Sequence, residues 1–178
     1  EIVEGQIRRV AEDLGPMACK TGMLANGPVV EAVAGVLRDL RLPGFVLDPV
    51  MVAQSGDRLL EEDAVRTLRD ELVPLAELVT PNLREAALLV GRDVEDEEDM
   101  RRAAEAIREM GAGAVLVKGG HREGERVLDV LLDDEGWHEW RAPRIRTRAG
   151  HGTGCTLSAA AAAGLSGGRG LRDALAAA

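Results

Sequence analysis

The sequence predicts an α/β fold in which a mostly parallel sheet is covered by helices on both faces. Short apolar segments, typical of buried strands, alternate along the chain with longer segments whose apolar residues recur at helical spacing. Strands that are joined by helices run parallel, and a parallel sheet needs cover on both faces. No linker, composition shift or internal repeat interrupts this alternation, so we expect a single domain over residues 1–178.

The first half of the chain is expected to begin with a helix over residues 3–14. Its apolar residues recur at intervals of three and four, and Gly15-Pro16 ends it. The next elements are a strand at 17–22, a helix at 29–40 opened by Pro28, a strand at 45–47, a helix at 60–72, a strand at 78–80 and a helix that runs from Pro81-Asn82 to residue 90 and stops at Gly91.

The second half begins with a charged helix at 96–110 that Gly111 closes. A strand at 114–117 then runs into Lys118-Gly119-Gly120. Residues 127–132 and 137–140 predict a β-hairpin that turns across 133–136. A helix rich in small residues follows at 157–165, and after a glycine-rich turn the last helix begins.

Composition and charge exclude several classes of protein. The net charge is −9 with the acidic residues spread out, which argues against nucleic acids and anionic membranes as partners. No apolar run approaches membrane-spanning length, and no signal-peptide pattern opens the chain. The two cysteines, Cys19 and Cys155, lack metal-site spacing and fit free thiols in a reducing compartment, so we expect a cytoplasmic protein.

Polar residues follow the predicted strands at the ends that a parallel sheet gathers on one edge. Lys20, Asp48, the segment 80–82 and Lys118 occupy these positions. Ligands of open α/β sheets bind beyond the carboxyl ends of the strands, so this edge is the expected active site. Lys20 and Lys118 are also the two lysines among 22 basic residues, which singles them out as compact positive charges.

The segment from His151 to Thr156 predicts an anion-binding helix start. Gly152 and Gly154 allow backbone N–H groups to turn toward an anion, and a helix N-terminus adds partial positive charge. Cys155 lies in the first turn, where we expect the pKa of its thiol to fall, whereas Cys19 lies in an apolar strand and should stay protonated. The alternative is an ordinary glycine-rich helix entry with a small buried cysteine.

Three acidic and amide residues have both a functional and a structural interpretation. Asp48, which ends a strand before Pro49, suits Mg²⁺ binding through water, or else simply forms a turn. Asn82 and Glu85 would face metal-bound phosphate from one helix turn. The same spacing is that of a capping box, and both roles can coexist.

A lysine, two histidines and a methionine lie in or near the predicted turns and strands. Lys118 would neutralise a phosphate, or else is a turn lysine. His121 is expected in a polar turn and His138 on an exposed face of the hairpin. Met23, just past a strand, is by itself expected in the core.

Taken together and in order, these segments resemble the ribokinase-like family. Within that family they look like the hydroxymethylpyrimidine and phosphomethylpyrimidine kinases of thiamine biosynthesis, and pyridoxal kinases share several of them. The matching segments, which span almost the whole chain, are Lys20-Thr-Gly-Met-Leu24, Leu47-Asp-Pro-Val-Met-Val52, Ser55-Gly-Asp57, Val79-Thr-Pro-Asn-Leu83 with Glu85, Val117-Lys-Gly-Gly-His121 and His151-Gly-Thr-Gly-Cys-Thr156.

The resemblance implies a three-layer αβα kinase that uses ATP and Mg²⁺. Its reaction would phosphorylate the hydroxymethyl group of 4-amino-5-hydroxymethyl-2-methylpyrimidine, and then the resulting monophosphate to the diphosphate. By position, Asp48 and Glu85 would organise the metal beside Asn82, and Lys118 would meet the ATP phosphates. The anion hole would be formed by Gly152, Thr153 and Gly154. Met23 would line the pyrimidine pocket, and Cys155 would stand where most of the superfamily has an aspartate base.

The chain departs from the family pattern at Gln54, where a lysine would be expected. The family's first strand and its glycine-rich segment have no counterpart in this sequence, and its last helices are cut short. Because the chain begins at Glu1 and ends within a helical pattern, we expect a longer parent protein. The alternatives are a pyridoxal kinase of the same fold and a truncated nucleotide-binding domain without catalysis. A homodimer is a further expectation from the family.

Overall fold

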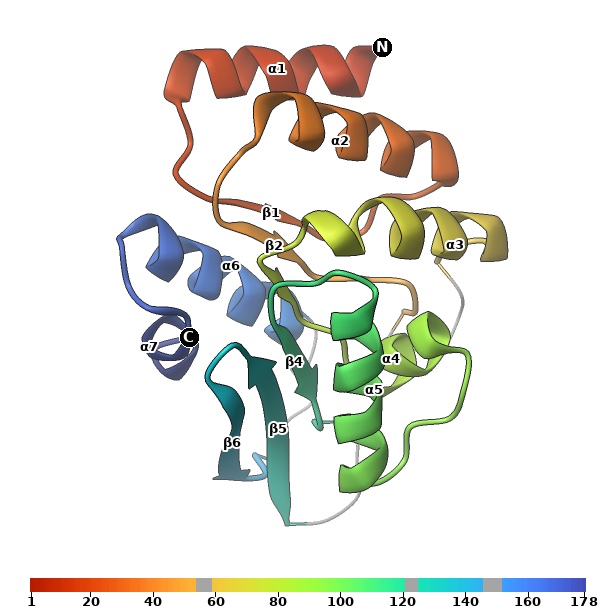
Figure 1. Ribbon diagram of the computed structural model, residues 1–178, viewed down its shortest axis with the longest axis vertical. Coiled ribbons are helices and arrows are strands. Elements are labelled where there is room, and N and C mark those ends of the chain that lie inside the picture. The colour runs from red at the N-terminus through yellow and green to blue at the C-terminus, as the bar shows by residue number, and fades with distance from the viewer. Residues whose placement is uncertain (54–58, 121–124, 146–151) are drawn as a thin grey trace.

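A computed structural model shows a six-stranded sheet between two layers of helices, as the alternation predicts (Figure 1). It describes residues 1–53, 59–120, 125–145 and 152–178. The helices are α1 (Ile2–Leu14), α2 (Gly27–Leu40), α3 (Glu62–Glu71), the short 3-10 helix η1 (Val73–Leu75), α4 (Leu83–Val90), α5 (Glu97–Glu109), α6 (Thr153–Ser166) and α7 (Leu171–Ala176). The strands are β1 (Cys19–Thr21), β2 (Phe45–Leu47), β3 (Leu78–Val79), β4 (Val115–Lys118), β5 (Arg126–Asp133) and β6 (Gly136–Pro143).

The strands lie side by side in chain order, from β1 to β6. The first four are parallel, with Lys20 opposite Val46, Val46 opposite Leu78 and Val79 opposite Val115. The predicted hairpin of β5 and β6 continues the sheet in the antiparallel direction. The mostly parallel sheet is thus confirmed, and the carboxyl ends of β1 to β4 meet on one edge.

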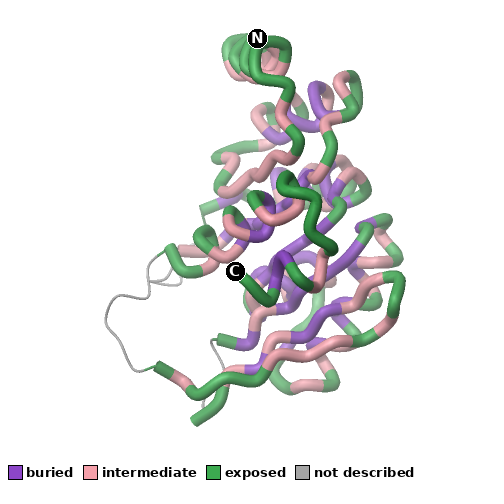
Figure 2. The backbone as a smooth tube through the Cα atoms, turned by 90° about the vertical axis from the view of Figure 1, so that its left-hand side faces the viewer, coloured by how far each residue is buried: buried purple, intermediate pink, exposed green. Residues whose placement is uncertain are grey.

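Two aliphatic cores lie on the two faces of the sheet, because side chains of a strand alternate between faces. Phe45, Leu47, Val79 and Val117 pack toward α2 to α5, whereas Val46, Leu78, Leu116 and Leu131 pack toward α6 and α7. Figure 1 shows α6 and α7 on the side of the sheet opposite α4 and α5, and Figure 2 shows the buried residues concentrated between the layers.

Helix ends follow the capping residues that the sequence contains. Gly15 and Gly91 end α1 and α4 in the left-handed conformation, as predicted. Asp96 caps α5 in a capping box with Asp99. Helix α6 begins at Thr153, four residues before the predicted start, because Gly152 itself is the N-cap residue. Within the described ranges, no helix is long and apolar enough to cross a bilayer.

Helix α1 is only partly covered, and one sequence expectation differs from the structure. On α1, Leu14 is 71% exposed although the helix contacts α2. His138 is not on an exposed face but half-buried, because its ring packs edge-on against Trp140 with centroids 4.3 Å apart.

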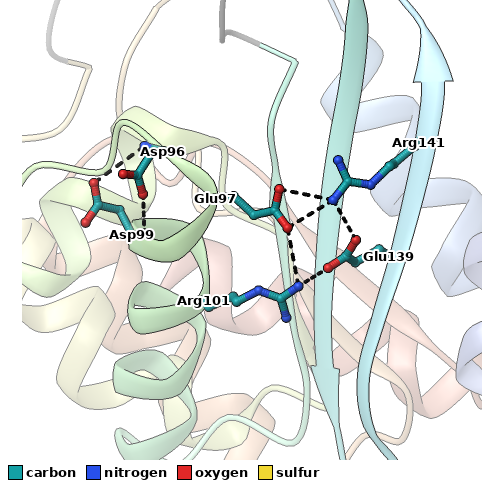
Figure 3. Close-up of polar contacts among 6 residues, drawn as sticks. All are labelled: Asp96, Glu97, Asp99, Arg101, Glu139 and Arg141. Atoms are coloured by element: carbon teal, nitrogen blue, oxygen red, sulfur yellow. Dashed lines mark hydrogen bonds and ion pairs between the residues drawn. The ribbon is translucent and has the colours of Figure 1, made fainter.

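A network of charged side chains attaches the hairpin to α5 (Figure 3). Arg141 of β6 binds Glu97 of α5 at 3.0 Å and its neighbour Glu139 at 2.9 Å. Arg101 contacts both of these carboxylates and lies 5.0 Å from the ring centre of Trp137. The network holds the hairpin in place at the side of β4, the strand that carries Lys118.

Gly119, directly after β4, lies against the neighbouring strand, and we predict that it tolerates no side chain. An added Cβ would lie 2.1 Å from the carbonyl oxygen of Leu128, whereas a Cβ at Gly120 would meet open space. We expect Gly119→Ala to lower the free energy of unfolding by about 3 kcal/mol, and the matched Gly120→Ala to change it by less than about 0.5 kcal/mol. Urea unfolding of the two variants measures this difference, and equal stabilities would contradict the close approach.

Candidate active site

The carboxyl edge of the parallel strands and the start of α6 enclose a pocket of about 280 Å³. Asp48 reaches it from the end of β2, Lys118 from the end of β4, and Asn82 and Glu85 from the start of α4. The pocket is closed on the α6 side by the segment Gly152, Thr153, Gly154 and Cys155. The structure therefore brings together eight residues that the sequence predicted for one site.

Asp48 lies at the centre of the site and is only 1% exposed. Its Oδ1 accepts hydrogen bonds from Lys118 Nζ at 3.1 Å and from Thr80 Oγ1 at 3.4 Å. Its Oδ2 accepts one from Ser158 Oγ at 3.1 Å and lies 3.5 Å from Lys20 Nζ. Both oxygens are thus occupied, which offsets the cost of burying a carboxylate.

Both lysines of the chain lie at the carboxylate of Asp48. Lys20 and Lys118 bring two ammonium groups to it, and Lys118 also acts electrostatically on the carboxyls of Glu85 and Asp129. Lys118 Nζ also lies 2.9 Å from the place that a Cβ on Gly154 would occupy, so the glycine lets this ammonium reach the first turn of α6. A cation beside a helix N-terminus is suited to bind an anion.

Gly152 shapes the entry to α6. It has φ +80°, a left-handed conformation that favours glycine, and its carbonyl accepts the N–H of Thr156 to begin the helix. The predicted glycine-rich helix start is therefore present, and Thr153, Gly154 and Cys155 of its first turn line the pocket. Its binding of an anion stays a prediction.

The predicted lowering of the Cys155 pKa is wrong. Desolvation raises the pKa of this thiol, and the negative charge of Asp48 and a hydrogen bond to its carboxylate raise it further. The positive charges of Lys20 and Lys118 oppose this without overcoming it. The expected state of Cys19 is confirmed, because burial raises the pKa of that thiol to about 11.

Of the two roles that the sequence left open for Asn82 and Glu85, the capping role is confirmed and the role toward metal-bound phosphate stays a prediction. Asn82 Oδ1 accepts the N–H of Glu85 at 3.0 Å, and Glu85 Oε2 accepts the N–H of Asn82 at 2.8 Å, which is a capping box. Both side chains nevertheless line the pocket. Burial raises the pKa of Glu85 to about 7, against the lowering effect of the Asn82 N–H and of Lys118.

Met23 follows β1 and is 56% exposed, so the expectation that it lies in the core is wrong. A tight turn follows it directly, in which the Asn26 N–H donates to the Leu24 carbonyl at 2.7 Å and Ala25 has φ +60°. Such strained turns occur at functional sites. Met23 is not among the residues that line the pocket around Asp48.

Sequence reasoning missed Ser158, which is fully buried and binds Asp48. Its spacing could have identified it as a site residue, since Ser158 lies one helical turn after Cys155, on the same face of the helix, in a segment rich in alanine. Gln54, Ser55-Gly-Asp57, His121 and His151 lie outside the described residues. Among the residues that the structure describes, no group of three or more His, Cys, Asp or Glu side chains is placed to hold a metal ion.

Comparisons with known proteins agree with this geometry. The family model for phosphomethylpyrimidine kinase matches residues 1–178. The hydroxymethylpyrimidine/phosphomethylpyrimidine kinase of Rhizobium meliloti is 51% identical over 100% of this chain and 67% of its own length. That of Streptomyces coelicolor is 47% identical over 95% of this chain and 62% of its own length.

Solved structures of related kinases share the fold. An ADP complex of Bacillus subtilis pyridoxal kinase matches with a TM-score of 0.90 and 36% identity, over 97% of this chain and 66% of that one. Phosphomethylpyrimidine kinase from Clostridium difficile matches with a TM-score of 0.85 and 33% identity, over 97% of this chain and 70% of that one. The chain thus spans about two thirds of the length of these relatives.

We predict that Glu85 makes the stability of the protein fall as the pH rises from 5 to 8. The pKa of Glu85 is about 7 in the folded protein against an ordinary value of 4.5, so the folded state binds the proton more tightly than the unfolded state. The stabilisation is complete below pH 4.5 and is lost as the pH rises to 7, by about 3 kcal/mol at most. Urea unfolding across this range should show the slope.

Glu85→Gln should flatten that slope, because glutamine mimics the protonated acid and its oxygen can still accept the Asn82 N–H. The exposed Glu12→Gln on α1 is the matched control and should keep the wild-type slope. A wild-type protein and a Glu85→Gln variant with the same pH dependence would contradict the raised pKa.

We predict that iodoacetamide alkylates Cys155 before Cys19, since Cys155 is the exposed thiol of the two. The pH at which Cys155 reacts at half its maximal rate should lie above that of a free cysteine. Asp48→Asn should move this midpoint to lower pH, because the variant removes the negative charge that favours the thiol. Peptide mapping over a pH series measures both effects. A wild-type midpoint below that of free cysteine would contradict the raised pKa and support the thiolate that the sequence predicted.

Proposed function

The chain belongs to the phosphomethylpyrimidine kinase family, and on this basis we propose that it transfers the γ-phosphoryl group of ATP to hydroxymethylpyrimidine. The acceptor is 4-amino-5-hydroxymethyl-2-methylpyrimidine, and a second transfer onto its monophosphate gives the diphosphate for thiamine biosynthesis. The observation that carries this proposal is the pocket in which Lys118 meets the N-terminus of α6 beside Cys155. Phosphoryl transfer depends mainly on positioning and on neutralising charge, which this arrangement supplies.

In the first transfer, the hydroxyl oxygen of the acceptor forms a bond to the γ-phosphorus while the bond to the bridging oxygen breaks and ADP leaves. Lys118 binds phosphate oxygens as a point charge, and the segment Gly152, Thr153 and Gly154 surrounds the transferred group with backbone N–H groups. This assignment is supported by the 2.9 Å approach of Lys118 Nζ to the Cβ position of Gly154.

Cys155 takes the proton of the acceptor hydroxyl in this proposal. Because its resting state is the thiol, it needs a group that accepts its own proton, and we assign this role to the carboxylate of Asp48, whose negative charge acts on the thiol. The hydroxyl proton passes to Sγ as the thiol proton passes to Asp48. A positioned base of this kind contributes about 10²- to 10⁴-fold to a rate.

The donor set fits Mg²⁺ that arrives with the nucleotide. Mg²⁺ is commonly held by one or two carboxylates together with phosphates and water. Asp48, Glu85 and Asn82 line the pocket. Because both oxygens of Asp48 already contact other groups, we assign to Asp48 a contact with the ion through a bridging water. When bound, the ion would neutralise charge on the phosphates, and the pKa of Glu85 would fall in its field.

We place the pyrimidine beside Met23, on the other side of Asp48 from Lys118. Residues 1–178 then form one kinase domain. We further propose a cytoplasmic homodimer without nucleic-acid or membrane partners; the free thiols and the net charge of −9 support the compartment and the lack of polyanionic partners. The second candidate activity is phosphorylation of pyridoxal, which the likeness to Bacillus subtilis pyridoxal kinase favours.

We predict that the purified protein consumes ATP with hydroxymethylpyrimidine and Mg²⁺ faster than with pyridoxal. A coupled assay of ADP release with each acceptor at equal concentration measures kcat/KM for both. Cys155→Ala should lose at least about 10²-fold in kcat with the pyrimidine while folding normally, because it removes the proposed base. Equal or faster turnover of pyridoxal would overturn the substrate, and turnover of neither would favour a nucleotide-binding domain without catalysis.

A further inference from the structure

Lys20 is the charged residue of the site that the proposed reaction has not yet used. Its side chain is 20% exposed, and its ammonium lies 3.5 Å from Asp48 Oδ2. Within the described part of the chain, this ion pair is its one contact with a charged group, and no hydrogen bond from its three N–H donors is found. A largely buried ammonium with unused donors is suited to bind an anion.

The two lysines of the cluster are not equivalent. Lys118 donates a hydrogen bond to Asp48 Oδ1 at 3.1 Å and lines the pocket at the start of α6. Lys20 approaches the other oxygen of Asp48 and does not line that pocket. Its Nζ lies 3.1 Å from the Cβ position of Gly22, the residue just before Met23. The two oxygens of Asp48 thus face different lysines, Lys118 beside the start of α6 and Lys20 beside Gly22, the residue that precedes Met23.

The two transfers of the proposed function place different demands on the acceptor side. In the first, a neutral hydroxyl attacks the γ-phosphorus and must lose a proton, so a base is needed. In the second, an oxygen of the acceptor's phosphate dianion attacks, a P–O–P bond forms, the bond to ADP breaks, and no hydroxyl proton has to be removed. The second transfer instead brings two polyanions together, which requires an additional positive charge.

We propose that Lys20 binds the phosphate of the monophosphate acceptor and thereby enables the second transfer. The inference rests on the proposed function and assigns its second acceptor to a particular residue. The ammonium of Lys20 lies next to Gly22, the residue before Met23. A pyrimidine bound beside Met23 would therefore bring its phosphate to an ammonium whose N–H donors make no hydrogen bond within the described residues. A charge-assisted contact of this kind is worth about 10- to 100-fold in affinity.

The test compares both acceptors in Lys20→Met, which keeps most of the side-chain volume and removes the charge. We expect kcat/KM for the pyrimidine monophosphate to fall about 10- to 100-fold, mainly through KM, and that for the hydroxymethylpyrimidine to fall several-fold at most. Lys20→Arg should restore part of the second transfer. Cys155→Ala should show the opposite selectivity and damage the first transfer more. Arg9→Met, which removes an exposed charge on α1, is the matched control and should change neither.

Direct binding gives a readout that does not depend on turnover. Isothermal titration without ATP should show the Kd of the monophosphate rising about 10- to 100-fold in Lys20→Met, and the Kd of the alcohol staying within about three-fold. If Lys20→Met fails to fold, the test uses the wild-type protein and measures KM for each acceptor as a function of ionic strength. The KM of the monophosphate should then rise more steeply with ionic strength than that of the alcohol, because salt screens the contact between phosphate and ammonium.

Equal losses with both acceptors would overturn the inference, because Lys20 would then act only through Asp48. A raised KM for ATP with both acceptors would also overturn it and assign Lys20 to the nucleotide. In either case a wild-type enzyme that phosphorylates hydroxymethylpyrimidine leaves the proposed function intact. A wild-type protein that phosphorylates neither acceptor would overturn the proposed function and this inference with it.

Discussion

The buried carboxylate of Asp48 is the constraint on which the site depends. A carboxylate that is 1% exposed is tolerated only if cations and donors surround it. Its partners come from β1, the end of β3, the end of β4 and the second turn of α6, so satisfying this one group requires four separate segments to converge. The same carboxylate also holds both lysines beside it, Lys118 at the pocket and Lys20 at its other oxygen.

The same cluster of charges connects stability with binding. Two ammonium groups surround the buried carboxylate of Asp48, and the start of α6 adds partial positive charge at the same place. Such an arrangement favours the binding of an anion. Desolvation, together with the negative charge of Asp48, raises the pKa of the Cys155 thiol and so favours the thiol over the thiolate.

The frame around the cluster explains how its geometry is maintained. Lys118 ends a strand that is paired on both sides, with β3 and with β5. Gly119 then passes so close to Leu128 that only a glycine fits, and its N–H donates to the side chain of Asp129 at 2.9 Å. The hairpin that provides these contacts is itself held to α5 by the ion pairs of Arg101 and Arg141 (Figure 3). The position of one ammonium therefore depends on packing that extends across the sheet.

The sequence by itself determined the order of the elements and most of the members of the site. Apolar periodicity, Gly15, Gly91 and the capping residues are local signals, which is why the helix ends could be read from them. Lys20, Asp48, Asn82 and Lys118 could be assigned to one edge because parallel strands bring their carboxyl ends together. Only the tertiary structure decided which group touches which. Ser158 was missed because its contact with Asp48 spans 110 residues of chain. The pKa of Cys155 was misjudged because desolvation and the charge of Asp48, which comes from a distant segment, raise it.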